Sequence, residues 1–160
     1  MPPDSGAGGA AIGEQAHHRA LEQLYAAAPI NALFASTLRI TGPGVAEIRF
    51  RADEHTFHAA GAAHGTVYFK MLDDAAFYAA NSLVSDRFLL TTGFNLHFTK
   101  PLRGGTVVAH GRWVSGRRRI FVAEAHLMDE EGDEIGRGTG TFMRSHIALS
   151  GLPGYGVGSL

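Results

Sequence analysis

The sequence predicts an α+β fold in which one antiparallel sheet wraps around a single central helix. Residues 66–83 are apolar around most of a helical circumference, and a helix of that kind belongs inside a core. Four segments of β character follow it, separated by short turn sequences rich in glycine and charged residues. A buried helix and a run of strands joined by short turns are typical of a sheet packed around one helix.

Composition limits the classes of function. The chain has 160 residues, 45% of them hydrophobic, so we expect one compact domain. It has no cysteine, which excludes disulfides and a cysteine nucleophile and favours a reducing compartment. With 14 Lys and Arg against 15 Asp and Glu, the net charge of −1 provides no field for holding nucleic acid or an anionic membrane. A small-molecule partner is therefore favoured.

The two ends of the chain predict a cytoplasmic protein with loose tails. Residues 1–10 lack a basic start followed by an apolar run, and no segment approaches the roughly 18 apolar residues that span a bilayer. Residues 1–13 and 145–160 contain few large apolar side chains and much Gly, Ser and Pro. We expect a disordered tail and a flexible tail on either side of one domain, residues 14–144.

The elements of this domain can be assigned in order. Residues 14–28 have alanine and leucine at helical spacing, and Pro29 ends that helix. Alternation on both sides of the turn at 41–44 predicts a hairpin of strands 34–40 and 45–51, followed by a loop over 52–63. After the central helix, the predicted strands are 88–99, 106–114, 120–128 and 135–143.

A motif lies at the start of the central helix. It consists of His64-Gly65-Thr66, six mixed residues, Asp73-Asp74 and then small residues. Downstream, residues 90–101 form a long strand-like segment that ends in an aromatic residue, a turn and a proline. Over residues 30–144, this ordered pattern resembles the phenylacetate-degradation (PaaI-like) branch of the hotdog-fold thioesterases.

The resemblance implies a hotdog fold, hydrolysis of acyl-CoA without a cofactor, and a homodimer or dimer of dimers with active sites at the subunit interface. Asp73 matches the acidic residue that serves as general base or nucleophile. Gly65 matches the glycine whose N–H faces the thioester oxygen. Thr91 falls where related enzymes place a hydroxyl from the partner subunit, and His58 falls where many place an Asn or Gln.

Two departures from the family pattern affect the substrate side of the site. Thr66 replaces a second glycine, which narrows the approach of the acyl group, and His58 replaces a side-chain amide. Asp73 also has an acidic neighbour, but its spacing of nine from His64 matches the family, which leaves Asp74 as a solvated or subunit-bridging carboxylate. His64 reads as structural, with its ring bonded to the loop backbone or a core acceptor.

The chemistry of these residue types agrees with the resemblance. Thioester hydrolysis needs a group that activates water and donors aimed at the developing oxyanion. The first N–H groups of a helix lack intrahelical partners and carry partial positive charge, so Gly65 lets a carbonyl oxygen approach closely. The alternatives are that Asp73 merely pairs with a polar neighbour and that Thr91 is only a strand former.

Two further clusters invite a binding role. His55 and His58 form an H-x-x-H, but without a helical pattern and the adjacent Glu we expect no metal. Arg117-Arg118-Arg119, together with Lys100 and Arg103, suits the phosphates of CoA, although a charged turn kept for solubility is equally expected.

Two other functions compete with hydrolysis on the same fold. Enoyl-CoA hydration is disfavoured because the Gly-Asp-x-Asn-Pro-x-x-His segment that is typical of hotdog hydratases is absent. A non-catalytic acyl-CoA-binding module is compatible with the fold, since fold does not fix function, but the presence of Asp73 argues against it. The sequence does not specify the acyl group or distinguish CoA from an acyl carrier protein.

Overall fold

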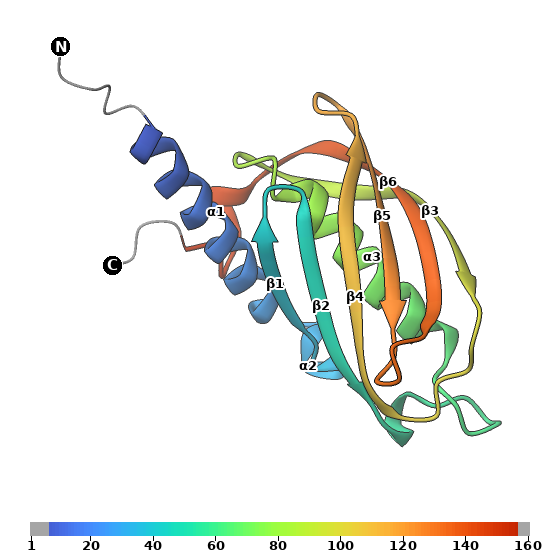
Figure 1. The fold of residues 1–160 in the computed structure, drawn as a ribbon. Coiled ribbons are helices and arrows are strands. Elements are labelled where there is room, and N and C mark those ends of the chain that lie inside the picture. Colours follow the sequence, from blue (N-terminus) through green and yellow to red (C-terminus); the bar gives the residue numbers. More distant parts are fainter. Residues whose placement is uncertain (1–6, 157–160) are drawn as a thin grey trace, which may run out of the picture.

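The computed structural model describes residues 7–156, which form a curved six-stranded antiparallel sheet in the order β1-β2-β4-β5-β6-β3 (Figure 1). The elements are α1 (Ala7–Ala27), α2 (Asn31–Phe34), β1 (Thr37–Gly42), β2 (Val45–Ala52), η1 (Glu54–Thr56), α3 (Gly65–Asn81), β3 (Arg87–Phe98), β4 (Gly105–Ser115), β5 (Ile120–Met128), β6 (Glu134–Ala148) and η2 (Leu149–Gly151). The predicted fold class, one antiparallel sheet wrapped around a central helix, is confirmed.

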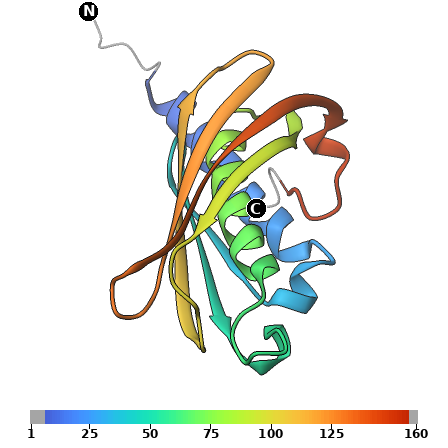
Figure 2. The ribbon, with the colours of Figure 1, turned by 90° about the vertical axis from the view of Figure 1, so that its right-hand side faces the viewer.

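The central helix α3 lies along one face of the sheet and contacts all six strands (Figure 2). Small residues allow this close packing. A Cβ added to Gly111 on β4 would lie only 2.0 Å from the carbonyl oxygen of Ala75, so helix and strand backbones touch directly at this point. Helix and sheet together enclose the core, whose largest fully buried side chains include Phe121, Phe142 and Met71.

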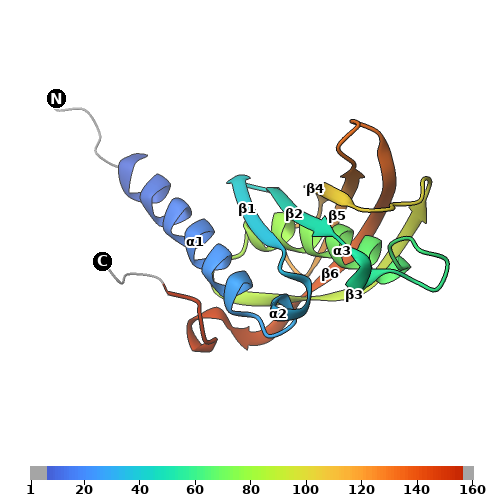
Figure 3. The ribbon, with the colours of Figure 1, turned by 90° about the horizontal axis from the view of Figure 1, so that it is seen from below.

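The two edges of the sheet differ. At one edge, α1 packs beside β1 through Leu21, Leu24 and Tyr25 (Figure 3). At the other edge, β3 pairs only with β6, and no described strand pairs with its free side. This edge exposes Leu90 and Phe98, which are 42% and 54% accessible. A long edge strand that carries exposed apolar residues is a surface for pairing with another chain.

The element boundaries agree closely with the sequence in the middle of the chain and less well at its ends. Residues 7–13, expected in the disordered tail, belong to α1. The flexible tail predicted from residue 145 is also wrong, because β6 continues to Ala148, Leu149 is fully buried and the Tyr155 hydroxyl contacts His17 Nδ1 at 2.7 Å. The rest of both predicted tails, residues 1–6 and 157–160, lies outside the described residues.

Across residues 7–156, no helix combines the length and the apolar character that crossing a membrane would require.

Candidate active site

Asp73 lies near the middle of α3, on the side that faces β3. The Thr91 hydroxyl on β3 donates a hydrogen bond to Asp73 Oδ1 at 3.0 Å. Burial raises the pKa of Asp73 to about 6, against the smaller lowering effect of the Thr91 hydrogen bond. The charge of Asp74 raises this pKa further, and that of Lys70 lowers it. A carboxylate whose pKa approaches the working pH is suited to taking a proton from water.

The neighbouring carboxylate, Asp74, has a different environment. It forms an ion pair with Lys70 and accepts a hydrogen bond from the Tyr25 hydroxyl at 2.9 Å. Burial raises the pKa of Asp74, and the Lys70 ammonium beside it acts in the opposite direction. The expectation that Asp74 is solvated is wrong, because its charge is matched inside the chain by Lys70 and the Tyr25 hydroxyl. The alternative, that it bridges subunits, stays a prediction.

The start of α3 leaves one backbone donor free. The His64 ring accepts a hydrogen bond from the Thr66 N–H at 3.0 Å, and the His64 carbonyl accepts one from Val67 at 2.9 Å. Within residues 7–156, the Gly65 N–H has no hydrogen-bond partner. A Cβ at Gly65 would lie 3.1 Å from the Phe98 ring, so a side chain there would crowd the space in front of this N–H. His64 therefore caps the helix, and Gly65 offers the free donor.

His58 and Gly65 line the same pocket, which has a volume of about 350 Å³. The other lining residues are Ala62, Ala63, Tyr68, Phe98, Thr99, Lys100 and Pro101. The His58 Nδ1 accepts a hydrogen bond from the Ala60 N–H at 3.0 Å. A neutral imidazole that accepts at Nδ1 carries its proton on Nε2, so His58 presents an N–H donor, as an amide side chain would.

These residues form two separate groups within one chain. Gly65 and Asp73 are eight residues apart on one helix, which corresponds to about 12 Å along its axis. His58 accompanies Gly65 in the pocket, whereas Thr91 accompanies Asp73. The family resemblance implied that the hydroxyl of Thr91 comes from the partner subunit, but here Thr91 contacts the Asp73 of its own chain. The side chain of the exposed Thr66 hydrogen-bonds to the His64 ring at 3.1 Å.

The arginine turn, residues 117–119, joins β4 to β5 and is exposed. The Arg117 guanidinium lies 4.3 Å from the centroid of the Trp113 ring, a cation–π contact. Strand register places the turn level with Thr91, because Ile120 pairs with Met143 and Met143 with Leu90. The turn therefore lies at the same end of the sheet as the Asp73 group.

Lys100 and Arg103 do not join this arginine turn, contrary to expectation. They lie beyond the other end of β4, whose 11 residues span about 35 Å (Figure 1). The Lys100 ammonium is bound by Asp129, Glu131 and Asp133 at 2.6 to 2.9 Å. These three carboxylates are the one group in residues 7–156 with a spacing suited to a metal ion, and a lysine ammonium fills it.

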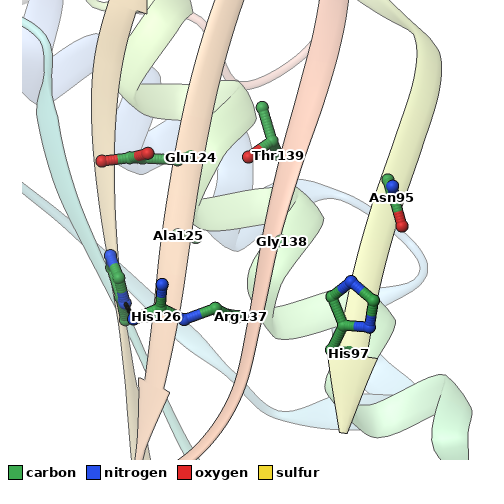
Figure 4. A pocket seen from close by; sticks show the side chains of 8 residues that line it. All are labelled: Asn95, His97, Glu124, Ala125, His126, Arg137, Gly138 and Thr139. Atoms are coloured by element: carbon green, nitrogen blue, oxygen red, sulfur yellow. Dashed lines mark hydrogen bonds between the residues drawn. The ribbon is translucent and has the colours of Figure 1, made fainter.

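A second hollow, of about 120 Å³, lies on the face of the sheet that α3 does not cover (Figure 4). It is lined by Asn95, His97, Glu124, Ala125, His126, Arg137, Gly138 and Thr139. Its main charges are matched: Arg137 and His126 contact Glu134, and Glu124 pairs with Arg112. None of the residues singled out in the sequence lines it.

Comparison with known proteins identifies the fold family. Residues 60–135 match the family model of the thioesterase superfamily. Over this segment, just under half of the chain, the protein resembles the thioesterase superfamily, and its fold is the hotdog fold. A search of curated proteins found no match.

Three solved structures illustrate the likeness of this hotdog-fold chain to known proteins. The PaaI protein from the phenylacetic acid degradation operon of E. coli is 15% identical, with a TM-score of 0.77 over 84% of this chain and 97% of that one. A thioesterase family protein from Silicibacter pomeroyi is 26% identical, with a TM-score of 0.74 over 80% and 97%. A thioesterase from Haemophilus influenzae is 19% identical, with a TM-score of 0.71 over 78% and 87%.

The sequence did not lead us to single out Lys70 on the central helix α3. Lys70, which contacts Asp74, also donates to Asn31 Oδ1 at 2.7 Å and to the Tyr25 hydroxyl at 3.1 Å. The spacing of four residues between Lys70 and Asp74 was a readable signal for an ion pair. Nothing in the sequence indicated that Tyr25 and Asn31 would meet them.

Proposed function

We propose that this chain hydrolyses acyl-CoA thioesters to a free acid and CoA, with Asp73 as the group that activates water. The observation that carries the proposal is the environment of Asp73: a partly buried carboxylate with a raised pKa, no cation partner among the described residues, and a hydroxyl 3.0 Å away. The match of residues 60–135 to the thioesterase superfamily supports thioester hydrolysis in general.

The separation between the two groups supports a site built from two chains. Thioester hydrolysis requires that the attacking water lie within hydrogen-bond distance of the base, and that the thioester oxygen lie within hydrogen-bond distance of the N–H donors. The axial separation of about 12 Å is too large for Gly65 and Asp73 of one chain to serve one thioester. Each site in the proposed dimer therefore combines Gly65 and His58 of one protomer with Asp73 and Thr91 of its partner.

The open edge of β3 supports this pairing. If the β3 strands of two protomers pair about a two-fold axis, the sheets become continuous and the two α3 helices lie antiparallel. The start of one helix then faces the middle of the other. Pairing would also cover the apolar residues exposed on this side, including Leu90, Phe98 and Phe69. The Phe69 ring lies beside β3, with its centroid 5.7 Å from that of Phe94. A dimer of two such dimers remains compatible with this arrangement.

The proposed reaction is balanced without a cofactor. Asp73 takes a proton from water, and the oxygen of that water bonds to the thioester carbon. The Gly65 N–H and the His58 Nε2–H stabilise the resulting oxyanion. Collapse breaks the C–S bond, and Asp73 returns its proton to the leaving sulfur, so that the free acid and the CoA thiol are released and the carboxylate is regenerated. Direct attack by the Asp73 carboxylate, followed by hydrolysis of the mixed anhydride, uses the same groups and stays an alternative.

The exposed arginine turn supports CoA as the carrier of the acyl group. Guanidinium groups bind phosphate in bidentate geometry, and residues 117–119 lie level with Thr91 on the sheet. We propose that this turn receives the CoA phosphates. A cytoplasmic location, where acyl-CoA would be encountered, stays a prediction from the sequence.

A free-thiol release assay across a panel of acyl-CoA esters tests the proposed function. Turnover that is lost in Asp73→Asn supports hydrolysis by Asp73. Tight binding without thiol release would identify an acyl-CoA-binding module instead. Loss of an enoyl-CoA double bond without thiol release would identify a hydratase.

A further inference from the structure

A buried ion pair lies directly beside the proposed base, and the hydrolysis scheme above does not use it. Lys70 is only 9% exposed, and its ammonium contacts Asp74, Asn31 Oδ1 and the Tyr25 hydroxyl. Replacing a buried ion pair with apolar residues is often neutral or stabilising, so stability alone does not account for the pair. Its position beside Asp73 gives it another possible use.

Helical geometry puts the Lys70 ammonium within reach of both carboxylates. Residues three and four positions apart on a helix are neighbours, so Lys70 can pair with Asp73 or with Asp74. An ammonium has three hydrogens, and four acceptors already surround this one: Asp74, Asn31, Tyr25 and, at 3.5 Å, the Ser36 hydroxyl. None remains for Asp73.

Aromatic rings hold the same ammonium on the side of α3 away from β3. Lys70 Nζ lies 5.0 Å from the centroid of the Tyr25 ring and 5.3 Å from that of Phe34. Cation–π attraction adds to the hydrogen bonds that the ammonium donates to Tyr25 on α1 and to Asn31 on α2. By contrast, the hydrogen bond that Asp73 accepts from a described side chain comes from the neutral hydroxyl of Thr91.

We propose that Asp74, Asn31 and Tyr25 are positioning residues that retain the Lys70 ammonium and so keep Asp73 an unpaired carboxylate, basic enough to activate water. The inference rests on the proposed role of Asp73. If Asp74 were uncharged, Lys70 would turn toward Asp73 and neutralise it. A carboxylate paired with a cation is a weaker base, because the pairing stabilises its charged form.

The other groups around Asp73 carry little charge. On α3 itself, Lys70 and Asp74 carry the charges that act on Asp73. Burial and the two nearby carboxylates raise the pKa of Tyr78, so its phenol is neutral. β3 presents the Thr91 hydroxyl, and α1 presents the Tyr25 phenol. The buried side chains of the strands that α3 contacts are apolar, for example Ile48, Phe121 and Phe142.

The test is the pH dependence of kcat/KM in full-length wild type, Asp74→Asn, Lys70→Met and the neutral pair Lys70→Met/Asp74→Asn, all with one acyl-CoA. Wild type should lose activity as pH falls through about 6. In Asp74→Asn this acidic limb should move down by about one pH unit. In Lys70→Met it should move up, and in the neutral pair it should lie between the two. The proposal would be overturned if the acidic limbs of wild type and all variants coincided, or if the limbs of Asp74→Asn and Lys70→Met moved in the same direction.

A variant with an unpaired buried charge can fail to fold, so a milder one keeps the test decisive. Asn31→Leu removes one acceptor of the ammonium and leaves the Lys70–Asp74 pair intact. Its acidic limb should move down by a few tenths of a pH unit. An unmoved limb in folded Asn31→Leu, checked by circular dichroism, would also overturn the proposal.

The same data separate this inference from the proposed function. If Asp73→Asn keeps wild-type activity and its acidic limb, then Asp73 is not the base and the proposed mechanism fails. If Asp73→Asn is inactive while the limbs of the Lys70, Asp74 and Asn31 variants do not move, only the inference about the ion pair fails.

Discussion

The adjacent carboxylates of Asp73 and Asp74 lie on two sides of α3 and have opposite electrostatic environments. On the side toward α1 and α2, Asp74 is matched by Lys70 and the Tyr25 hydroxyl. On the side toward β3, Asp73 has the Thr91 hydroxyl and no described cation. Buried carboxylates are costly unless their charge is matched. We therefore assign Asp74, whose charge is matched, a structural role and propose Asp73, whose charge is not matched, as the catalytic base.

The largest effect should separate these two carboxylates. Asp73→Asn keeps the size of the side chain and removes its basicity, so kcat should fall by about a hundredfold or more. Asp74→Asn should lose less than about tenfold at pH 8, where Asp73 is ionised in either case. Steady-state thiol release measures both, with circular dichroism as the check on folding. Equal losses, or a loss only in Asp74→Asn, would contradict the assignment.

The donor side of the site should respond next. His58→Ala removes one oxyanion donor and should lower kcat by up to about a hundredfold. His58→Gln is the matched control, because its amide restores an N–H, and it should recover a large part of the activity. Equal activity in the alanine and glutamine variants would show that the ring is not a donor.

The arginine turn should affect binding more than chemistry. Replacing Arg117, Arg118 and Arg119 with Ala should raise KM for acyl-CoA severalfold at low ionic strength and change kcat less. Arg39→Ala, which changes an exposed arginine on β1 at the opposite edge of the sheet from β3, is the comparison variant and should leave KM near the wild-type value. An unchanged KM in the triple variant would remove the turn from the CoA site.

The smallest expected effect is on stability. Since folding raises the pKa of Asp73 to about 6, from about 3.9 in the unfolded chain, the folded protein loses stability as pH rises from about 4 to 6. Asp73→Asn avoids this loss. At pH 8 it should be more stable than wild type by about 1–2 kcal/mol, discounted for partial exposure, with no gain at pH 4. Urea unfolding at matched protein concentration measures this, and an equal gain at both pH values would contradict the raised pKa.

The sequence predicts this fold well where one local pattern decides the structure. The apolar stripe of α3 and the β character of the four later segments, bounded by turn sequences, locate those elements closely. The C-terminal segment was missed because its order comes from distant contacts, such as that between Tyr155 and His17, and these leave no local pattern.

The sequence named candidate site residues, but it could not give their arrangement. The motif located Gly65 and Asp73, and the Asp73–Thr91 hydrogen bond agrees with that assignment. The sequence could not show that Thr91 meets the Asp73 of its own chain, because that depends on how β3 packs against α3. It also could not show that Asn31 and Tyr25 hold Lys70, since they come from other elements.

Subunit mixing tests the central claim most directly, namely that each site joins Asp73 and Thr91 of one protomer to Gly65 and His58 of the other. Asp73→Asn and His58→Ala protomers, dissociated and reassociated together, should form heterodimers with one intact site. The mixture should regain about a quarter of wild-type activity if the protomers pair at random. Asp73→Asn mixed with Thr91→Ala should not complement, since both changes affect the same half of the site. Recovery in the second mixture and not in the first, with subunit exchange demonstrated, would contradict the account.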